Sequence, residues 1–297
     1  QLGIPHRTRD YVDLFCGAVI APFAAAYRRG LTPNPCIECN RRVRFGALLE
    51  EATRDGFDAL ATGHHVRLRR DGGGWRLLRG VDPHKDQSYV LHMLGQAQLA
   101  HLEFPVGEMT KDEVRRRARA LGLASAERVE SQDLCFAGPG GYRAFLREQF
   151  PEAVVPGPIV DSSGREVGRH DGVAGFTVGL RRGLGVAAGE PRYVVAIRPE
   201  TATVVIGGPR DLLADGCRVG PVSWVAGRPP TDGSGLEAKV RYLSRPVAVD
   251  LEAGHPEEWW LWFGEPQAAV TPGQAAVVYR GDEVLGGGTI VAALRGR

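Results

Sequence analysis

Hydrophobic and polar positions in the first half of the chain follow helical and strand periods in turn. Apolar residues at helical spacing predict a helix over residues 43–53, which Gly56 ends. A short apolar run at residues 59–62 predicts a buried strand. Gly63 and the two histidines after it then fall at the carboxyl end of that strand, where open α/β sheets bind their ligands.

Two further helices are predicted from local signals. Thr110 and Glu113 form the capping-box pattern that opens a helix, and Gly122 is suited to end it. Another helix is expected after residues 140–141, with aromatic and apolar side chains on one face. We therefore expect residues 1–150 to form an α/β domain.

The second half of the chain lacks long helical periods. After a glycine-rich stretch, short alternating runs predict strands and hairpins at residues 193–197, 203–206, 236–242, 275–279 and 283–285. Closely spaced short strands are typical of a small β-barrel, and the tryptophan-rich run 259–263 fits its core and rim. The predicted organisation places a central domain at residues 151–208 and a C-terminal β-barrel domain at residues 209–297.

Composition narrows the class of protein without identifying it. Hydrophobic residues make up 43% and charged residues 24% of the chain, as in soluble globular proteins, and no apolar run is long enough to cross a membrane. The net charge of +2 does not require a nucleic-acid partner, so RNA binding would depend on local basic clusters. The candidate arginines are Arg41, Arg42 and Arg44, then Arg67, Arg69 and Arg70, then Arg115, Arg116, Arg117 and Arg119.

The five cysteines are sparse and odd in number, which argues against a secreted disulfide framework and favours a cytoplasmic protein. Cys36 and Cys39 form a CxxC pair directly after a Pro-Asn-Pro turn, and Cys135 follows about a hundred residues later. Cysteines in a reducing compartment are catalytic, metal-binding or buried. Burial is the prediction for Cys16 and Cys217, whereas composition leaves the other three open.

The spacing of Cys36 and Cys39 also suits a zinc knuckle. No second CxxC or histidine pair completes four ligands, so the fold would have to recruit Cys16 and Cys135. We expect no metal site, although a zinc-stabilised structural module stays an alternative. A thioredoxin-like site is disfavoured because the pair does not follow a βαβ start.

Six motifs occur in order along the chain. They are Thr32-Pro33-Asn34-Pro35 with Cys39-Asn40, Ala61-Thr62-Gly63-His64, Lys85-Asp86-Gln87-Ser88-Tyr89, Asp133-Leu134-Cys135-Phe136, Arg241-Tyr242, and Thr271-Pro272-Gly273-Gln274 with Gly286-Gly287-Gly288. Together they resemble the tRNA-specific 2-thiouridylases, the MnmA (TrmU) family, over essentially the whole chain. The resemblance implies an α/β fold, with an adenine-nucleotide alpha hydrolase-like (PP-loop ATPase) domain, a small central domain and a β-barrel.

The resemblance also implies an ATP-dependent sulfurtransferase that 2-thiolates the wobble uridine of tRNA. ATP, with Mg²⁺, would adenylate the uracil oxygen at carbon 2. Cys135 would carry a persulfide received from a sulfur-relay or cysteine desulfurase-linked donor protein. Its terminal sulfur would reach the base directly or after release by the nucleophile Cys39, leaving a Cys39–Cys135 disulfide.

The resemblance carries over a set of binding residues as well. They are Gly63 for ATP and, for the tRNA, Asn34, Pro35, Cys36, His64, Lys85, Asp86, Gln87, Arg241, Tyr242 and Gln274. Glycine suits close approach of a ligand to the backbone, and lysine suits a phosphate. The target base would have to turn out of the anticodon stack to reach residues 34–36.

Two departures from the family pattern shape these expectations. The chain shows no Ser-Gly-Gly-x-Asp-Ser-Ser phosphate loop, which we attribute to truncation and which predicts weak ATP binding. A non-catalytic tRNA- or partner-binding remnant is the alternative. Cys36 stands where other members carry Asp, and Asp133 lies close enough in sequence to Cys135 to influence its protonation.

Overall fold

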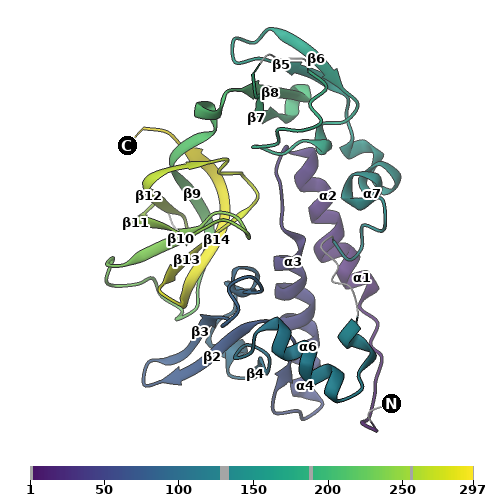
Figure 1. Ribbon diagram of the computed structural model, residues 1–297, viewed down its shortest axis with the longest axis vertical. Coiled ribbons are helices and arrows are strands. Elements are labelled where there is room, and N and C mark those ends of the chain that lie inside the picture. Colours follow the sequence, from purple (N-terminus) through teal and green to yellow (C-terminus); the bar gives the residue numbers. More distant parts are fainter. Residues whose placement is uncertain (1–2, 128–133, 187–189, 255–256, 297) are drawn as a thin grey trace.

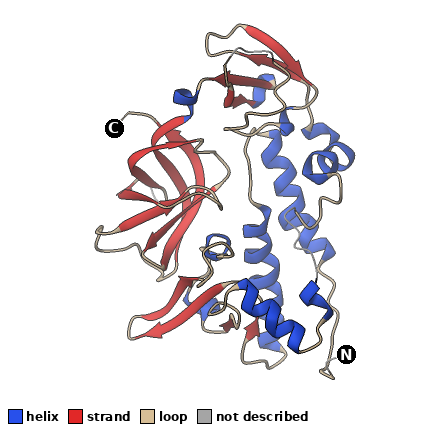
Figure 2. Ribbon diagram, viewed as in Figure 1, coloured by secondary structure: helices blue, strands red, loops and turns tan. Residues whose placement is uncertain are grey.

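The computed structural model describes residues 3–127, 134–186, 190–254 and 257–296. Figure 1 shows two helical columns along the long axis of the molecule, with a β-barrel beside them. A small sheet lies at one end of the molecule and a β-hairpin projects at the other. Figure 2 shows that most helices lie on one side of the molecule and the barrel strands on the other.

The first column joins α1 (Val12–Phe15), the π-helical segment Cys16–Ile20 and α2 (Ala21–Arg28). Of residues 14–20 only Val19 is fully buried, and Cys16 is exposed. The prediction that Cys16 is buried is therefore wrong. An apolar stretch on a helix presents only one face to the core, and Cys16 lies on another face.

The second column joins α3 (Pro35–Glu38), the π-helical segment Cys39–Leu48 and α4 (Leu49–Arg54). The predicted helix over residues 43–53 exists, but it begins earlier, at Pro35. Asn34 is its N-cap, because the Asn34 side chain accepts a hydrogen bond from the Cys36 backbone N–H at 3.1 Å. Proline at the first helical position costs no hydrogen bond there. Cys36 and Cys39 thus lie on the first turn of a long helix and not in a loop.

A two-stranded parallel sheet of β1 (Leu60–Ala61) and β4 (Leu102–Glu103) packs on the second column, since Leu60 and Leu102 share a core with Phe45 and Leu49. The predicted strand at residues 59–62 is confirmed, although it is shorter than expected. The helices α5 (Gln96–Leu99) and α6 (Lys111–Ala120) precede and follow β4 in the chain. The capping box of α6 is confirmed, since Glu113 N–H donates to Thr110 Oγ1 and Thr110 N–H donates to the Glu113 carboxylate.

The helix expected after residues 140–141 is α7 (Gly141–Gln149), and its buried Leu146 packs with Phe23 and Tyr27 of α2. The central region that follows holds β5 (Gly157–Val160), β6 (Glu166–His170), β7 (Tyr193–Arg198) and β8 (Thr203–Gly207) in the order β6-β5-β8-β7. The predicted hairpin of residues 193–197 and 203–206 is confirmed by the antiparallel β7–β8 pair.

Six strands form the barrel: β9 (Leu213–Trp224), β10 (Leu236–Lys239), β11 (Val247–Ala253), β12 (Trp259–Ala268), β13 (Ala275–Arg280) and β14 (Glu283–Leu294). They pair in the order β13-β10-β11-β12-β9-β14, and pairing of β13 with β14 closes the ring. The predicted strand over residues 236–242 ends at Lys239, because Arg241 N–H turns to bond Ser244 Oγ.

The barrel packs directly on the helical side through β13. Alternate residues of a strand point to opposite faces, so Ala276 and Val278 fill the barrel interior while Val277 and Tyr279 pack with Phe45 and other residues of the N-terminal core. The hairpin of β2 (Val66–Asp71) and β3 (Gly74–Arg79) extends the barrel sheet beyond β14. The barrel therefore lies against the second helical column, which carries Cys36 and Cys39.

Candidate active site

One pocket of about 540 Å³ lies between the two helical columns and the barrel. Among the residues that line it are nine of the predicted site residues: Asn34, Pro35, Cys36, Cys39, His64, Gln87, Cys135, Tyr242 and Gln274. We call it the thiol pocket, because three cysteines from two distant segments line it. All three sulfurs are free thiols in this structure.

Contacts between two of the sequence motifs fix the helix that carries Cys36 and Cys39. Thr32 N–H donates to the Pro272 carbonyl at 3.0 Å, and the Gln274 amide donates to the Thr32 carbonyl at 2.7 Å. A Cβ on Gly273 would stand 2.7 Å from Thr32 N, and the Gly273 φ of +93° also favours glycine. The barrel loop thus holds the segment that leads into the helix.

Aromatic packing positions the third thiol. Cys135 is exposed, but the next residue, Phe136, meets the rings of Phe23 and Phe145 edge-on at 5.3 Å and 5.1 Å between centroids. Phe136 thereby anchors its segment to α2 and α7. Asp133 lies outside the described residues, so its suggested influence on Cys135 stays a prediction.

The pocket walls and the neighbouring thiols govern the protonation of the CxxC pair. Desolvation by the surrounding protein raises the pKa of Cys36 above its usual value, as do Cys135 and Cys39, while Arg44 opposes the shift. Cys36 as a whole residue is exposed, and the wall of the thiol pocket that it lines supplies the surrounding protein. Burial likewise raises the pKa of Cys39, and again Arg44 acts in the opposite direction. Both cysteines are therefore mainly thiols at neutral pH, with the guanidinium favouring their thiolates.

Arg44 also organises the polar wall of the pocket. Its Nη1 donates to Asn40 Oδ1 at 3.0 Å and to His64 Nε2 at 3.2 Å. Because His64 Nε2 accepts, its Nδ1 carries the proton and donates to Thr62 Oγ1 at 2.8 Å. Burial and the adjacent guanidinium lower the pKa of His64 to about 4. His64 is therefore a neutral imidazole in a defined orientation.

A second pocket of about 410 Å³ opens in front of Gly63 and adjoins the thiol pocket. We call it the glycine pocket; its lining is Arg44, Leu48, Leu60, Ala61, Thr62, Gly63, His64 and Gln87. Arg44, His64 and Gln87 line both pockets. Apart from Gly63 itself and its two chain neighbours, no protein atom lies within 4 Å of where a Cβ on Gly63 would stand, so a planar ligand has room to approach this backbone.

In the Lys85-Asp86-Gln87 segment, Asp86 and Gln87 make hydrogen bonds that hold the loop in place. Gln87 Oε1 accepts from His65 N–H at 2.9 Å, which ties the loop to the end of β1. Asp86 is buried and accepts hydrogen bonds from Gly80 N–H and from both the N–H and the hydroxyl of Ser88. Lys85 lines neither the thiol pocket nor the glycine pocket. The contacts of Asp86 favour a loop-holding role for its carboxylate.

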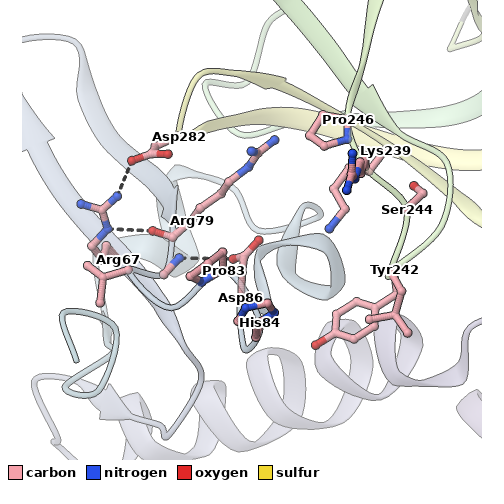
Figure 3. Close-up of a pocket in the computed structure, with 14 residues that line it drawn as sticks. Arg67, Arg79, Pro83, His84, Asp86, Lys239, Tyr242, Ser244, Pro246 and Asp282 are labelled. Carbon is pink, nitrogen blue, oxygen red and sulfur yellow. Dashed lines mark hydrogen bonds and ion pairs between the residues drawn. The ribbon is translucent and has the colours of Figure 1, made fainter. Parts of the chain in front are cut away.

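A third pocket, of about 790 Å³, lies between this loop and the barrel and carries an excess of basic side chains. Figure 3 shows Lys239 and Tyr242 on the barrel side facing Pro83, His84 and Asp86 on the loop side. Arg67, Arg79 and Arg245 add positive charge, and Asp282 pairs with Arg67 at 2.7 Å. We call it the basic pocket. Tyr242 lines both this pocket and the thiol pocket, so the two are neighbours.

Arg241 lies apart from the lining of these pockets. Its Nη2 donates to the Val178 carbonyl at 2.7 Å and to Thr271 Oγ1 at 2.6 Å. These bonds join the central region to the barrel loop that ends at Gln274. Arg241 thus contributes to the site by holding its walls together.

Sequence reasoning missed several residues of the site. Arg44 was considered only as part of an arginine cluster, although it lies one helical turn after Asn40 and directly contacts it. The aromatic wall formed by Phe23, Tyr27 and Tyr142 was also missed. Tyr27 and Tyr142 stack at 5.1 Å between centroids. Their contact joins α2 to α7, and no local pattern signals it.

A metal site and a membrane-spanning helix can both be looked for among the residues that the structure describes. Among them, no three His, Cys, Asp or Glu side chains are grouped so as to hold a metal ion, which leaves the zinc alternative without support there. In the same part of the chain no helix is long and apolar enough to cross a bilayer.

Three protein-domain families match successive parts of the chain. The tRNA methyl transferase HUP domain matches residues 1–139, the tRNA methyl transferase PRC-barrel domain residues 143–208, and the aminomethyltransferase beta-barrel domain residues 214–290. The architecture expected from the sequence, an α/β domain followed by a central domain and a β-barrel, is confirmed. The residue boundaries of the domains given above stay a prediction.

Full-length relatives give the same assignment. The tRNA-specific 2-thiouridylase MnmA of Chloroflexus aggregans is 50% identical over 290 residues, which cover 97% of this chain and 81% of the relative. Those of Roseiflexus castenholzii and Carboxydothermus hydrogenoformans are 47% and 44% identical, over 98% of this chain and 82% and 80% of the relatives. The chain belongs to the tRNA-specific 2-thiouridylase (MnmA) family.

Proposed function

We propose that this protein is a tRNA sulfurtransferase that replaces the oxygen at carbon 2 of the wobble uridine by sulfur. The observation that carries the proposal is the thiol pocket, where Cys39 and Cys135 converge from distant segments beside the glycine pocket. The family supports tRNA as the substrate. The geometry supports thiol chemistry next to a nucleotide-sized space.

The proposed reaction needs an activated oxygen and a reactive sulfur. ATP, as its magnesium complex, would supply the AMP group that activates the uracil oxygen, with release of pyrophosphate. Cys135 enters the cycle as a persulfide, and the Cys39 thiolate attacks the inner sulfur. That step forms the Cys39–Cys135 disulfide and releases hydrosulfide, which attacks carbon 2 and expels AMP. In the second route the terminal persulfide sulfur attacks carbon 2 and expels AMP. The Cys39 thiolate then attacks the Cys135 sulfur, which forms the same disulfide and releases 2-thiouridine.

The residues around the glycine pocket fit the nucleotide. The open backbone at Gly63 leaves room for a base, and the apolar side chains of Leu48 and Leu60 offer a surface for its face. Neutral His64 is held between Thr62 and Arg44 at the boundary of the two pockets. Because His64 carries no charge at neutral pH, Arg44 is the cation available there to a phosphate or to a developing oxyanion.

The basic pocket supports the tRNA part of the proposal. A flipped uridine in the thiol pocket would have its flanking backbone next to Tyr242, and the basic pocket begins on the other side of that ring. Lys239 and the arginines there would meet phosphates. We assign Lys85, on the same loop as Asp86, to the phosphate contacts as well.

Two partners complete the proposed cycle. A sulfur-relay or cysteine desulfurase-linked protein must deliver the persulfide to Cys135, whose exposure permits transfer between proteins. A dithiol reductant must reopen the disulfide. Both requirements suit a cytoplasmic location.

Nucleoside analysis tests the proposal. Unmodified tRNA incubated with the protein, a persulfide donor and enough ATP to offset the weak binding expected above should yield 2-thiouridine at the wobble position, and Cys135→Ser should yield none. The matched control is Cys16→Ser, because Cys16 is an exposed thiol that does not line the pocket. Methylated uridine instead of 2-thiouridine, or 2-thiouridine formed by Cys135→Ser, would overturn the proposal.

A further inference from the structure

The thiol pocket holds one more cysteine than the proposed reaction uses. Cys39 and Cys135 suffice for persulfide release, yet Cys36 lines the same pocket and is exposed. A cysteine kept only as a small hydrophobic side chain would be buried, as Cys217 is. Cys36 is therefore an accessible thiol beside two reacting thiols.

The helix start places Cys36 and Cys39 within reach of each other. Residues three apart on a helix lie on one face, with Cβ atoms about 5–6 Å apart. A disulfide needs Cβ atoms about 3.5–4.5 Å apart, so a small adjustment of the first turn is enough. The first turn is also the easiest part of a helix to adjust, because its N–H groups have no partners within the helix. The Asn34 cap holds the Cys36 N–H during such a change.

We propose that Cys36 resolves the Cys39–Cys135 disulfide, so that the oxidised form of the pocket becomes a Cys36–Cys39 disulfide. The inference rests on the proposed function, which creates the first disulfide. The Cys36 thiolate attacks the Cys39 sulfur, the Cys36–Cys39 bond forms, the Cys39–Cys135 bond breaks, and Cys135 leaves as a thiolate. No electrons are gained or lost by the protein. A cellular dithiol then reduces the Cys36–Cys39 disulfide in a separate step.

The exchange has two consequences for the catalytic cycle. Cys135 becomes free to accept the next persulfide before any reductant has acted. The remaining disulfide includes Cys36, an exposed residue that an external reductant can reach. The raised pKa of Cys36 makes the exchange slow near neutral pH and faster as the pH rises, because only the thiolate attacks.

Disulfide mapping tests the inference. The protein is loaded at Cys135 with sodium polysulfide, left to react, trapped with N-ethylmaleimide and digested for mass spectrometry. The expected dominant linkage is Cys36–Cys39, with Cys135 alkylated. In Cys36→Ser and Cys36→Ala the Cys39–Cys135 linkage should accumulate instead, whereas Cys16→Ser should match the parent protein. Thermal unfolding of each variant checks that it is folded.

Turnover at limiting dithiol gives an independent readout. Both Cys36 variants should lose on the order of tenfold in steady-state rate, and a large excess of dithiothreitol should restore most of the loss. Cys39–Cys135 as the main linkage in the parent protein would overturn the inference and leave the proposed function standing. Absence of any linkage to Cys135 in both Cys36 variants would count against the proposed function itself. Zinc or iron bound in stoichiometric amount, and lost in Cys36→Ser, would also overturn the inference.

Discussion

Cysteines occur in two contrasting regions of this molecule, the thiol pocket and the barrel interior. Cys217 is 0% exposed among Leu261, Val219 and Ile290, and burial raises its pKa to about 12. Cys36 and Cys135 are exposed, and Cys39 is half-buried beside Arg44. The same side chain is therefore an inert part of a core in one region and, in the proposed function, a reagent in the other.

The difference lies in how the two regions are built. Regular alternation along paired strands surrounds Cys217 with apolar side chains on every side. The thiol pocket is assembled where a helix start, a strand end, an anchored loop and a barrel turn meet. Such irregular junctions leave side chains accessible while rigid elements hold them in place. Accessibility and a nearby cation, and not residue type, therefore distinguish the cysteines that we propose to react from the structural Cys217.

The largest expected effect is on activity. Cys39→Ser and Cys135→Ser should each lower the rate of 2-thiouridine formation by on the order of a thousandfold or more, because each removes a sulfur that changes bonding partners. The thermal midpoints of both variants should stay close to that of the parent protein. Equal loss of activity in Cys16→Ser would show that the contrast between pocket and surface thiols is wrong.

Alkylation measures accessibility directly. Under native conditions at pH 8, iodoacetamide should modify Cys36 more than a hundredfold faster than Cys217, whose reaction requires opening of the barrel. Peptide mass spectrometry over a time course gives both rates. Comparable rates for the two cysteines would mean that the barrel opens readily. That result would contradict the contrast between an accessible Cys36 and an inaccessible Cys217.

Acid stability probes the packing of the barrel on the rest of the molecule, where His92 is buried next to Gly287 of β14. Its Nδ1–H donates to the Tyr89 carbonyl at 2.9 Å, and burial lowers its pKa to about 4 from 6.5. Between pH 4 and pH 6.5, His92 is therefore protonated in the unfolded chain and neutral in the folded chain. Above pH 6.5 His92 should have no effect on the free energy of unfolding. As the pH falls toward 4, the free energy of unfolding should decrease by on the order of 3 kcal/mol.

Urea unfolding at pH 7 and pH 4.5 checks this expectation. His92→Gln keeps a donor for Tyr89 but cannot titrate, so its loss of stability with acid should be smaller than that of the parent protein. An unchanged acid dependence in His92→Gln would assign the loss to other groups, His64 first among them, since burial lowers its pKa similarly.

The free energy of unfolding should respond differently to serine substitution in the two cysteine environments. Cys217→Ser places a hydroxyl in an apolar interior and should lower the free energy of unfolding by about 1–3 kcal/mol. Cys36→Ser, at an exposed position, should change it by less than about 0.5 kcal/mol. Denaturant titration gives both values. A larger loss in Cys36→Ser than in Cys217→Ser would reverse the assignment of structural and reactive thiols.

The smallest expected effect concerns RNA. Lys85→Ala should weaken tRNA binding and reduce the slope of log affinity against log salt by about one, as expected for one lost phosphate contact. Cys135→Ser should keep tRNA affinity within about twofold. Filter binding at several salt concentrations measures both. The reverse pattern would mean that the loop at residues 134–137 binds the tRNA and that the Lys85 loop does not.

Local signals in the sequence predicted local structure well. The capping box at Thr110 and the hairpin around residues 199–201 depend on neighbouring residues, and both are confirmed. The start of the helix at Pro35 was missed, because Thr-Pro-Asn-Pro is typical of a turn as well as of a cap and first helical position. Burial of Cys16 was wrong, because an apolar stretch does not specify which helix face meets the core.

The candidate site could be predicted only as separate pieces. Motif resemblance supplied the cysteines, Gly63 and Gln274, but it gave no distances between them. The bond from Arg44 to His64 and the docking of Gln274 on Thr32 join residues far apart in sequence, so no periodic pattern indicates them. Buried Asp86, and Arg241 through its bonds to Val178 and Thr271, show that motif residues also hold the walls of the site.

Tracing of the transferred sulfur tests the central claim most directly. Cys135 is loaded with a persulfide whose terminal sulfur is a heavy isotope, and tRNA and ATP are then added. The account predicts heavy sulfur at carbon 2 of the wobble uridine and a disulfide that includes Cys39, with neither product in Cys135→Ser. Heavy sulfur in the tRNA of a Cys135→Ser reaction, or label that stays on the protein while unlabelled 2-thiouridine forms, would contradict it.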